Sequence, residues 1–228
     1  MARQVIRTTE FARESAGFIV AIARAALGQR GEFRIALSGG NTPRPVYAEL
    51  ARRALHWEKT LVTFGDERCV PPEDEQSNFR MARETLFNPA HVPASSVLRM
   101  RGEIEPPLAA DEYQEQLDTL ATQRSEKIYE HDLILLGIGD DGHTASLFPD
   151  TAALKETRRR VVANYVPKLE TWRLTFTLPL IFAANEICFL VNSNKSASLV
   201  ERVFSGDESL PSTLVDRGAK RVTWILGK

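Results

Sequence analysis

The chain has only two cysteines among its 228 residues, Cys69 and Cys188, and they form no CxxC pair. Two distant cysteines cannot supply the disulfide framework of a small secreted domain or a set of thiolate ligands for zinc. We therefore expect two reduced thiols that pack as small apolar side chains in a cytoplasmic protein.

Long apolar runs are also missing from the chain. The first 15 residues, MARQVIRTTEFARES, are polar and contain no apolar core of a secretory signal. The longest apolar stretches, such as 132–139 and 186–191, are shorter than the roughly 20 residues that a transmembrane helix needs. We expect neither a signal peptide nor an association with a membrane.

The net charge of the chain is also close to zero. The chain has 29 lysines and arginines against 30 aspartates and glutamates, which gives a formal charge of −1. A protein dedicated to nucleic acid normally has a basic excess, so we expect no nucleic-acid partner. The charge balance leaves the oligomeric state open, and a monomer is compatible with it.

What the chain does contain is the composition of a folded globular protein. Hydrophobic residues make up 43% of it and charged residues 26%, which excludes a disordered or fibrous chain. A single domain of this size buries roughly 70% of its unfolded surface and needs no metal or disulfide to fold. We interpret residues 1–228 as one domain.

Short apolar runs alternate with helical patterns along the chain. Runs with the length of buried strands occupy 33–37, 61–64, 133–136, 187–191 and 222–226. Apolar residues recur at helical spacing within 11–26, 43–55, 108–127 and 195–204. This alternation predicts an α/β fold with a mostly parallel sheet and helices on both faces. The segment 173–177 (RLTFT) alternates polar and apolar residues, which predicts an extra or edge strand.

The residues that follow each run are the candidates for a site, because ligands of open α/β sheets bind outside the carboxyl ends of the strands. The first run is followed by Ser38-Gly39-Gly40-Asn41-Thr42-Pro43. The glycines allow a tight turn with accessible N–H groups, and Thr42 and Pro43 suit the N-cap and first position of a helix. Such a turn is typical of an anion site, although a plain strand-to-helix turn has the same pattern.

Charged side chains follow the second run. Asp66, Glu67 and Arg68 come directly after Gly65. The planar guanidinium suits a phosphate, and the carboxylates suit sugar hydroxyls. A solvated surface cluster has the same sequence, so this motif alone leaves both interpretations open.

A lysine follows the fourth run. Lys195 opens the helix that we expect from this position, where a cation opposes the helix dipole by a few tenths of a kcal/mol. That misfit favours a lysine that faces an anionic ligand, and a solvated surface lysine is the alternative.

The third run is followed by GIGDDGH at residues 137–143. Its glycines satisfy GxGxxG, but that dinucleotide fingerprint needs a helix that opens at its third glycine, and here Pro149 follows within two turns. Asp140 and Asp141 would also place negative charge where a pyrophosphate would lie. We therefore expect no nucleotide cofactor.

His143 ends this motif, and Asp141 stands two residues before it. Histidine suits proton transfer near neutral pH, so we interpret His143 as a general base that Asp141 orients. Asp140, Asp141 and His143 could ligate a divalent metal, but no HExxH spacing supports this, and we expect no metal. The chain also lacks a GxSxG elbow and a P-loop, which argues against a serine nucleophile and against nucleotide triphosphates.

Seven segments together form a pattern that spans nearly the whole chain. They are LSGGNTPRPVY (37–47), GDERCVPPEDEQSNFRMA (65–82), LLGIGDDGHTASLFP (135–149), VPK (166–168), RLTFTLPLI (173–181), NK (194–195) and WIL (224–226). GxGxDGHTASLFP together with DERxVP is a specific pair. By these segments the chain resembles the 6-phosphogluconolactonases.

The resemblance implies a Rossmann-like, three-layer α/β domain and an enzyme without a required cofactor. Family members hydrolyse 6-phospho-D-glucono-1,5-lactone to 6-phosphogluconate in the oxidative pentose phosphate pathway, so the partner expected here is a small sugar-phosphate lactone. At the matched positions His143 takes the role of the base that activates water, with Asp141 beside it. The residues implied to bind substrate are Ser38, Gly39, Gly40, Thr42, Asp66, Arg68, Lys168, Arg173 and Lys195.

Two other functions share part of this pattern. The related glucosamine-6-phosphate deaminases have the GxGxDGH core but typically place a glutamate after the histidine, and residues 144–149 (TASLFP) contain no carboxylate. A non-catalytic sugar-phosphate sensor would usually bring a DNA-binding segment, whereas we expect only one long helix before Phe33. The chain departs from the family after Lys168, where LETW replaces residues that are often prolines, and at Gly227-Lys228, where many members continue. The lactonase is the favoured interpretation.

Overall fold

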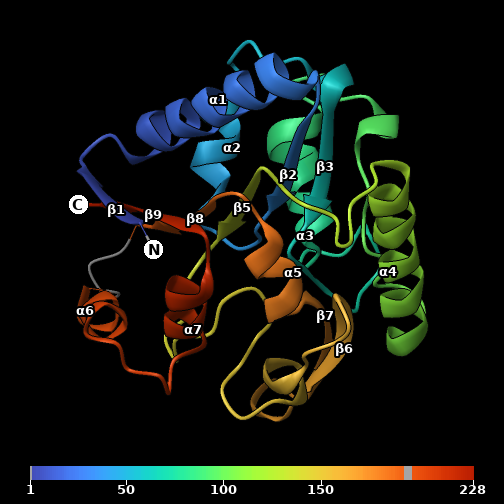
Figure 1. Ribbon diagram of the computed structural model, residues 1–228, viewed down its shortest axis with the longest axis vertical. Coiled ribbons are helices and arrows are strands. Elements are labelled where there is room, and N and C mark those ends of the chain that lie inside the picture. The colour runs from blue at the N-terminus through green and yellow to red at the C-terminus, as the bar shows by residue number, and fades with distance from the viewer. Residues whose placement is uncertain (1, 193–196) are drawn as a thin grey trace.

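The computed structural model describes residues 2–192 and 197–228 (Figure 1). Its centre is a six-stranded sheet in the order β1-β9-β8-β5-β2-β3, in which all neighbouring strands run parallel. The strands are β1 (Ala2–Thr8), β2 (Phe33–Leu37), β3 (Thr60–Phe64), β5 (Leu133–Leu136), β8 (Ile187–Val191) and β9 (Arg221–Gly227). The mostly parallel sheet and all five apolar runs are confirmed.

Side chains alternate between the two faces of this sheet and divide the core into two parts. Ile35 and Leu37 of β2 pack with the helices on one face, whereas Ala36 packs on the other. The helices are α1 (Phe11–Arg30), α2 (Arg44–Leu50), α3 (Asn78–Ala82), α4 (Pro106–Gln123), α5 (Leu178–Ala183), α6 (Ala197–Ser205) and α7 (Pro211–Gly218). The first three contribute to one core and the last four to the other, which confirms the predicted three layers.

A second sheet lies beside the first. It is antiparallel, in the order β4 (Asp66–Arg68), β7 (Thr171–Phe176) and β6 (Val161–Val166). Gly65 alone separates β4 from β3, and its carbonyl accepts a hydrogen bond from Phe176 N at 2.8 Å. The strand predicted within 173–177 is therefore confirmed as part of β7, whereas β4 and β6 were not predicted.

Two expectations near the N-terminus are wrong. The segment before Phe33 holds a strand besides the long helix, because Ala2–Thr8 pairs with β9 along the edge of the parallel sheet. The predicted helix 43–55 is shorter, since α2 ends at Leu50. Of the described residues, no helix is long and apolar enough to cross a bilayer.

In the middle of the parallel sheet, between β2 and β5, the strand order reverses, because the chain adds its next strand on opposite sides of these two. β2 and β5 are neighbours, but the chain leaves β2 toward β3 on one side and leaves β5 toward β8 on the other (Figure 1). The loops after these two strands therefore diverge and leave a crevice at the carboxyl edge, which is where open α/β sheets bind ligands.

Candidate active site

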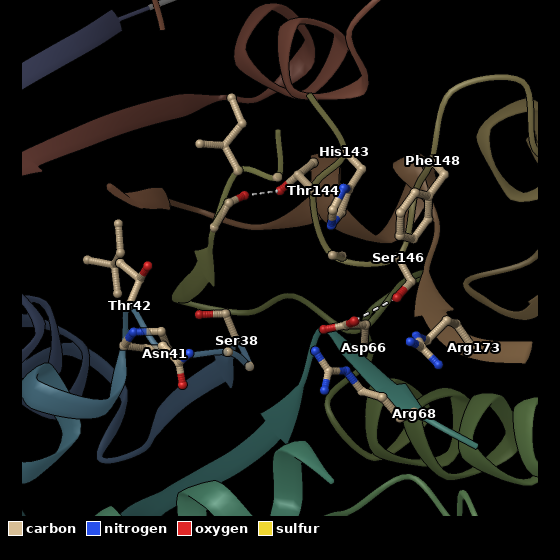
Figure 2. A pocket seen from close by; sticks show the side chains of 18 of the residues that line it. Ser38, Asn41, Thr42, Asp66, Arg68, His143, Thr144, Ser146, Phe148 and Arg173 are labelled. Carbon is tan, nitrogen blue, oxygen red and sulfur yellow. Dashed lines mark hydrogen bonds between the residues drawn. The ribbon is translucent and has the colours of Figure 1, made fainter. Parts of the chain in front are cut away.

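A pocket of about 330 Å³ lies at this crevice (Figure 2). Its wall combines the loops after β2 and β5 with residues of β4, β7 and β8. The predicted site residues that line it are Ser38, Gly39, Gly40, Thr42, Asp66, Arg68, His143 and Arg173. Segments far apart in the sequence thus meet at the edge where the sequence predicted a site.

Two predicted residues of the described part of the chain are not part of this lining. Asp141 and Lys168 lie next to it and are bonded to each other, and Asp141 is also bonded to His143. Lys195 lies outside the described residues. The prediction that Lys168 binds substrate therefore has an alternative, because its ammonium group already has a partner.

The loop after β2, residues 38–43, turns tightly at the edge of the sheet. Tyr47 Oη fixes its start, since it accepts a hydrogen bond from Ser38 N (3.0 Å) and donates one to Ser38 O (2.8 Å). Gly39 is required because a Cβ there would lie 1.8 Å from Asn78 Oδ1. The glycine allows α3 to approach the loop closely.

The hydrogen-bond donors that this loop offers to a ligand are its own N–H and hydroxyl groups, not the N-terminus of a capped helix. Thr42 is not the N-cap as predicted: Pro43 precedes α2 directly, no side-chain cap bond forms, and α2 has only seven residues. Ser38 Oγ is buried and has no hydrogen-bond partner among the described residues. Within the same residues, the backbone N–H groups of 39–42 donate no hydrogen bond either. An anion at this point would be bound by these N–H and hydroxyl groups.

His143 stands at the end of a tight loop that begins at Gly139. Gly139 N donates to His143 O at 2.9 Å, and a Cβ on Gly139 would lie 1.9 Å from the ring atom Cε1. The ring of Phe148 stacks on the imidazole, with centroids 4.0 Å and planes 20° apart. Contact with Gly139 and Phe148 fixes the orientation of the imidazole.

Asp141 is bonded to one nitrogen of that imidazole. His143 Nδ1 lies 2.5 Å from Asp141 Oδ1, and Lys168 Nζ donates to Asp141 Oδ2 at 3.0 Å. Burial alone would raise the pKa of Asp141, but the hydrogen bonds from His143 and Lys168 outweigh it and lower the pKa to about 2. The charged carboxylate favours a proton on Nδ1 and leaves Nε2, which lacks a partner in the described chain, as the basic nitrogen.

Two arginines lie opposite each other on neighbouring strands of the second sheet. Arg68 of β4 and Arg173 of β7 are directly opposite in the antiparallel register, and among the described residues neither pairs with a carboxylate. Arg68 Nε is buried and has no hydrogen-bond partner within residues 2–192 and 197–228. Burial and the nearby Arg68 lower the pKa of Arg173. Because like charges opposite each other destabilise a sheet, the pair is best explained by an anion that binds between them.

Asp66 and Glu67 hold the structure around these arginines. Asp66 accepts hydrogen bonds from Ser146 Oγ (2.7 Å) and Asn78 Nδ2 (3.3 Å), so both of its oxygens already have protein donors. Glu67 is buried and accepts bonds from Asn78 N (2.7 Å) and Phe79 N (2.8 Å) at the start of α3. Burial raises the pKa of Glu67, and this residue does not line the pocket.

Phe148 and Ser146 are among the pocket residues that the sequence did not predict. Phe148 stacks on His143, and Ser146 bonds to Asp66 (Figure 2). Both belong to the segment 135–149, but their neighbours along the chain give no sign of these contacts, which form only when the segment folds back over β4 and His143.

Other groups with potential chemistry lie apart from the pocket. Within residues 2–192 and 197–228, no cluster of three histidine, cysteine, aspartate or glutamate side chains could hold a metal ion. Cys188 is buried and Cys69 is half-buried, and burial raises the pKa of Cys69 to about 11. These thiols are not poised as nucleophiles.

The comparisons with known proteins agree with the geometry. Residues 7–224 match the family described as glucosamine-6-phosphate isomerases/6-phosphogluconolactonase. The 6-phosphogluconolactonases of Synechocystis and of Treponema pallidum are 42% and 36% identical to the chain, over 88% and 86% of it and 84% and 82% of their own lengths. The solved structure of the 6-phosphogluconolactonase from Trypanosoma brucei superposes with a TM-score of 0.85 at 28% identity, and covers 100% of this chain and 96% of that one.

Proposed function

Because the chain belongs to the family of glucosamine-6-phosphate isomerases and 6-phosphogluconolactonases, we propose that it hydrolyses 6-phospho-D-glucono-1,5-lactone to 6-phosphogluconate. This is the lactone-opening step of the oxidative pentose phosphate pathway. The observation that carries the proposal is one pocket that holds both an oriented histidine and two arginines that pair with no carboxylate in the described part of the chain.

The phosphate binds at the arginine side of the pocket. Arg68 and Arg173 supply charge-assisted hydrogen bonds, and Ser38 Oγ and the N–H groups of 39–42 supply neutral ones. Figure 2 shows His143 on the far side of the pocket from Arg68 in this view. This arrangement suits a substrate that is anionic at one end and reactive at the other. Lys195, predicted to join these cations, lies outside the described residues.

The reaction is the attack of water on the lactone carbonyl. His143 Nε2 takes a proton from the water as its oxygen bonds to C1, and Asp141 stabilises the imidazolium that forms. The tetrahedral intermediate then collapses, the bond from C1 to the ring oxygen breaks, and His143 returns the proton to that oxygen. General-base assistance of this kind is typically worth about 10²–10⁴-fold.

The compartment belongs to the same proposal. Both cysteines are free thiols in the structure, and reduced thiols are typical of the cytoplasm. We place the reaction there, with the sugar-phosphate lactone as the partner of the pocket.

A rate measurement with a metal control tests the function. The purified chain should accelerate the loss of 6-phosphogluconolactone over its spontaneous hydrolysis, and EDTA should leave the rate unchanged. No acceleration would reject the lactonase. Release of ammonia from glucosamine 6-phosphate would instead identify a deaminase.

A further inference from the structure

The second sheet contains a buried asparagine that contacts the segment with His143 and Phe148. Asn164 of β6 is only 1% exposed. Its Nδ2 donates to Ser146 O at 2.9 Å and to Thr151 Oγ1 at 3.0 Å. A single side chain thus bonds to the segment on both sides of Phe148.

The other strands of this sheet bond to the same point. Ser146 N donates to Thr175 Oγ1 of β7 at 3.1 Å, and Ser146 Oγ donates to Asp66 Oδ2 of β4 at 2.7 Å. With Asn164, each of the three strands supplies one partner to Ser146. The second sheet is therefore a frame for the segment that packs against the base.

This segment contains two residues in an unfavourable backbone conformation. Ala145 has φ +48° and Asp150 has φ +62°, in the left-handed region that glycine prefers. Such conformations persist only where the surrounding structure enforces them. Each is followed directly by a residue that Asn164 holds, since Ser146 follows Ala145 and Thr151 follows Asp150.

We propose that Asn164 is a positioning residue for the lactonase reaction: by holding Ser146 and Thr151, it keeps Phe148 stacked on His143 and the imidazole aligned for attack. The proposal rests on the proposed function. Asn164 does not line the pocket, so it acts only through the segment. The phosphate-binding arginines, Arg68 and Arg173, project from β4 and β7, and Arg173 is paired with Asn164 only through the strand register, which a change of the Asn164 side chain leaves in place. Substrate binding should therefore depend on the Asn164 amide less than turnover does.

Substitution of Asn164 tests this by separating kcat from KM. Asn164→Asp keeps the shape but exchanges the amide donor for an oxygen that repels Ser146 O, and Asn164→Ala removes the group if the aspartate variant fails to fold. Misplacement of a catalytic group by about 1 Å can cost about 10²-fold in rate. We expect kcat to fall at least about tenfold while KM changes less than about threefold, in line with lost alignment rather than lost binding.

Ser96→Ala is the matched control, since Ser96 Oγ also makes a buried hydrogen bond to a carbonyl, Trp57 O at 2.7 Å, away from the pocket. It should lower thermal stability but leave kcat unchanged. An Asn164 variant that folds with the kcat of the wild type, or loses no more kcat than Ser96→Ala at an equal drop in Tm, would overturn the proposal.

A readout without substrate separates this proposal from the function itself. The Phe148 ring shields the protons of the His143 imidazole, so NMR should show this upfield shift in the wild type and its loss in Asn164→Ala. A retained shift would also overturn the proposal. A wild type that shows the shift but hydrolyses no lactone would reject the function and leave the role of Asn164 in the segment supported.

Discussion

Two histidines of this chain are hydrogen-bonded to a carboxylate two residues away, but the two pairs lie in very different surroundings. His143 Nδ1 lies 2.5 Å from Asp141, and these side chains are 30% and 24% exposed. His56 Nδ1 lies 3.1 Å from Glu58 on the surface, where the side chains are 71% and 62% exposed. The residue types match, but only the first pair is packed against an aromatic ring and lies at a pocket.

The difference lies in the neighbours of each pair, and these neighbours are what would allow the histidine of a pair to act as the proposed base. Water competes for the His56–Glu58 bond and leaves the imidazole free to rotate. Around His143, the stacking of Phe148 holds the imidazole in one orientation, and the hydrogen bonds from His143 and Lys168 keep the Asp141 carboxylate charged.

The largest effect should come from the histidines themselves. His143→Ala should lower kcat for lactone hydrolysis by about 10²–10⁴-fold, because the general base is lost. His56→Ala is the matched control and should leave kcat unchanged, with circular dichroism showing an intact fold for both. Equal rates in the two variants would remove His143 as the base.

Loss of an arginine should act on binding rather than on the base. Arg173→Met removes hydrogen bonds to a charged group, worth roughly 1.5–3 kcal/mol, and should raise KM by roughly 10–100-fold with a smaller change in kcat. It should not lower Tm, because the substitution relieves repulsion from Arg68. Arg217→Met, which breaks the surface pair with Glu208, is the control and should change neither constant. An unchanged KM in Arg173→Met would exclude Arg173 from phosphate binding.

The charge state of Asp141 predicts a pH-dependent stability. Its pKa is about 2 in the folded chain, below the roughly 3.9 of an unfolded aspartate. The charged form therefore contributes stability above about pH 4 that is lost as the pH falls through about 2. Relative to Asp141→Asn, the wild type should gain on the order of 1 kcal/mol at pH 7 and less at pH 3, as measured by urea unfolding, since the side chain is partly solvated.

Glu58→Gln provides the surface comparison for that experiment. It should change the free energy of unfolding less than Asp141→Asn does at pH 7, because the His56–Glu58 pair is largely exposed. A stability difference that is equal at both pH values in Asp141→Asn would contradict a lowered pKa.

The smallest effect should come from Lys168. Its side chain is 68% exposed, and an exposed ion pair is worth roughly 0.2–1 kcal/mol. Lys168→Met should therefore lower kcat/KM by roughly two- to fivefold, through a less restrained Asp141. A loss as large as that of Arg173→Met would show that Lys168 binds substrate directly.

The sequence could predict those parts of the fold that have a local signature. Buried parallel strands are short apolar runs, so β2, β5 and β8 were predicted with their observed bounds. β4 is three charged residues and β1 is a largely exposed edge, so neither has an apolar run to mark it. Their pairing is decided by the partners that the tertiary structure brings to them.

The site divides in the same way, into contacts that are local in the sequence and contacts between distant segments. His143 and Asp141 are close in the sequence, and the loop motif was enough to predict that they interact. The register that sets Arg68 opposite Arg173, and the bonds from Asn164 to Ser146, join residues from distant segments. No spacing in one sequence reports such contacts, because they depend on how the second sheet packs beside the first.

The proposed role of His143 depends most directly on the tautomer of its imidazole, which ¹⁵N NMR at neutral pH can measure beside that of His56. Neutral His143 should carry its proton on Nδ1 and none on Nε2, whereas His56 should exchange between both tautomers in water. The Nδ1–H signal should disappear in His143→Ala and change in Asp141→Asn. A neutral His143 protonated on Nε2 would contradict its role as the base that faces the pocket.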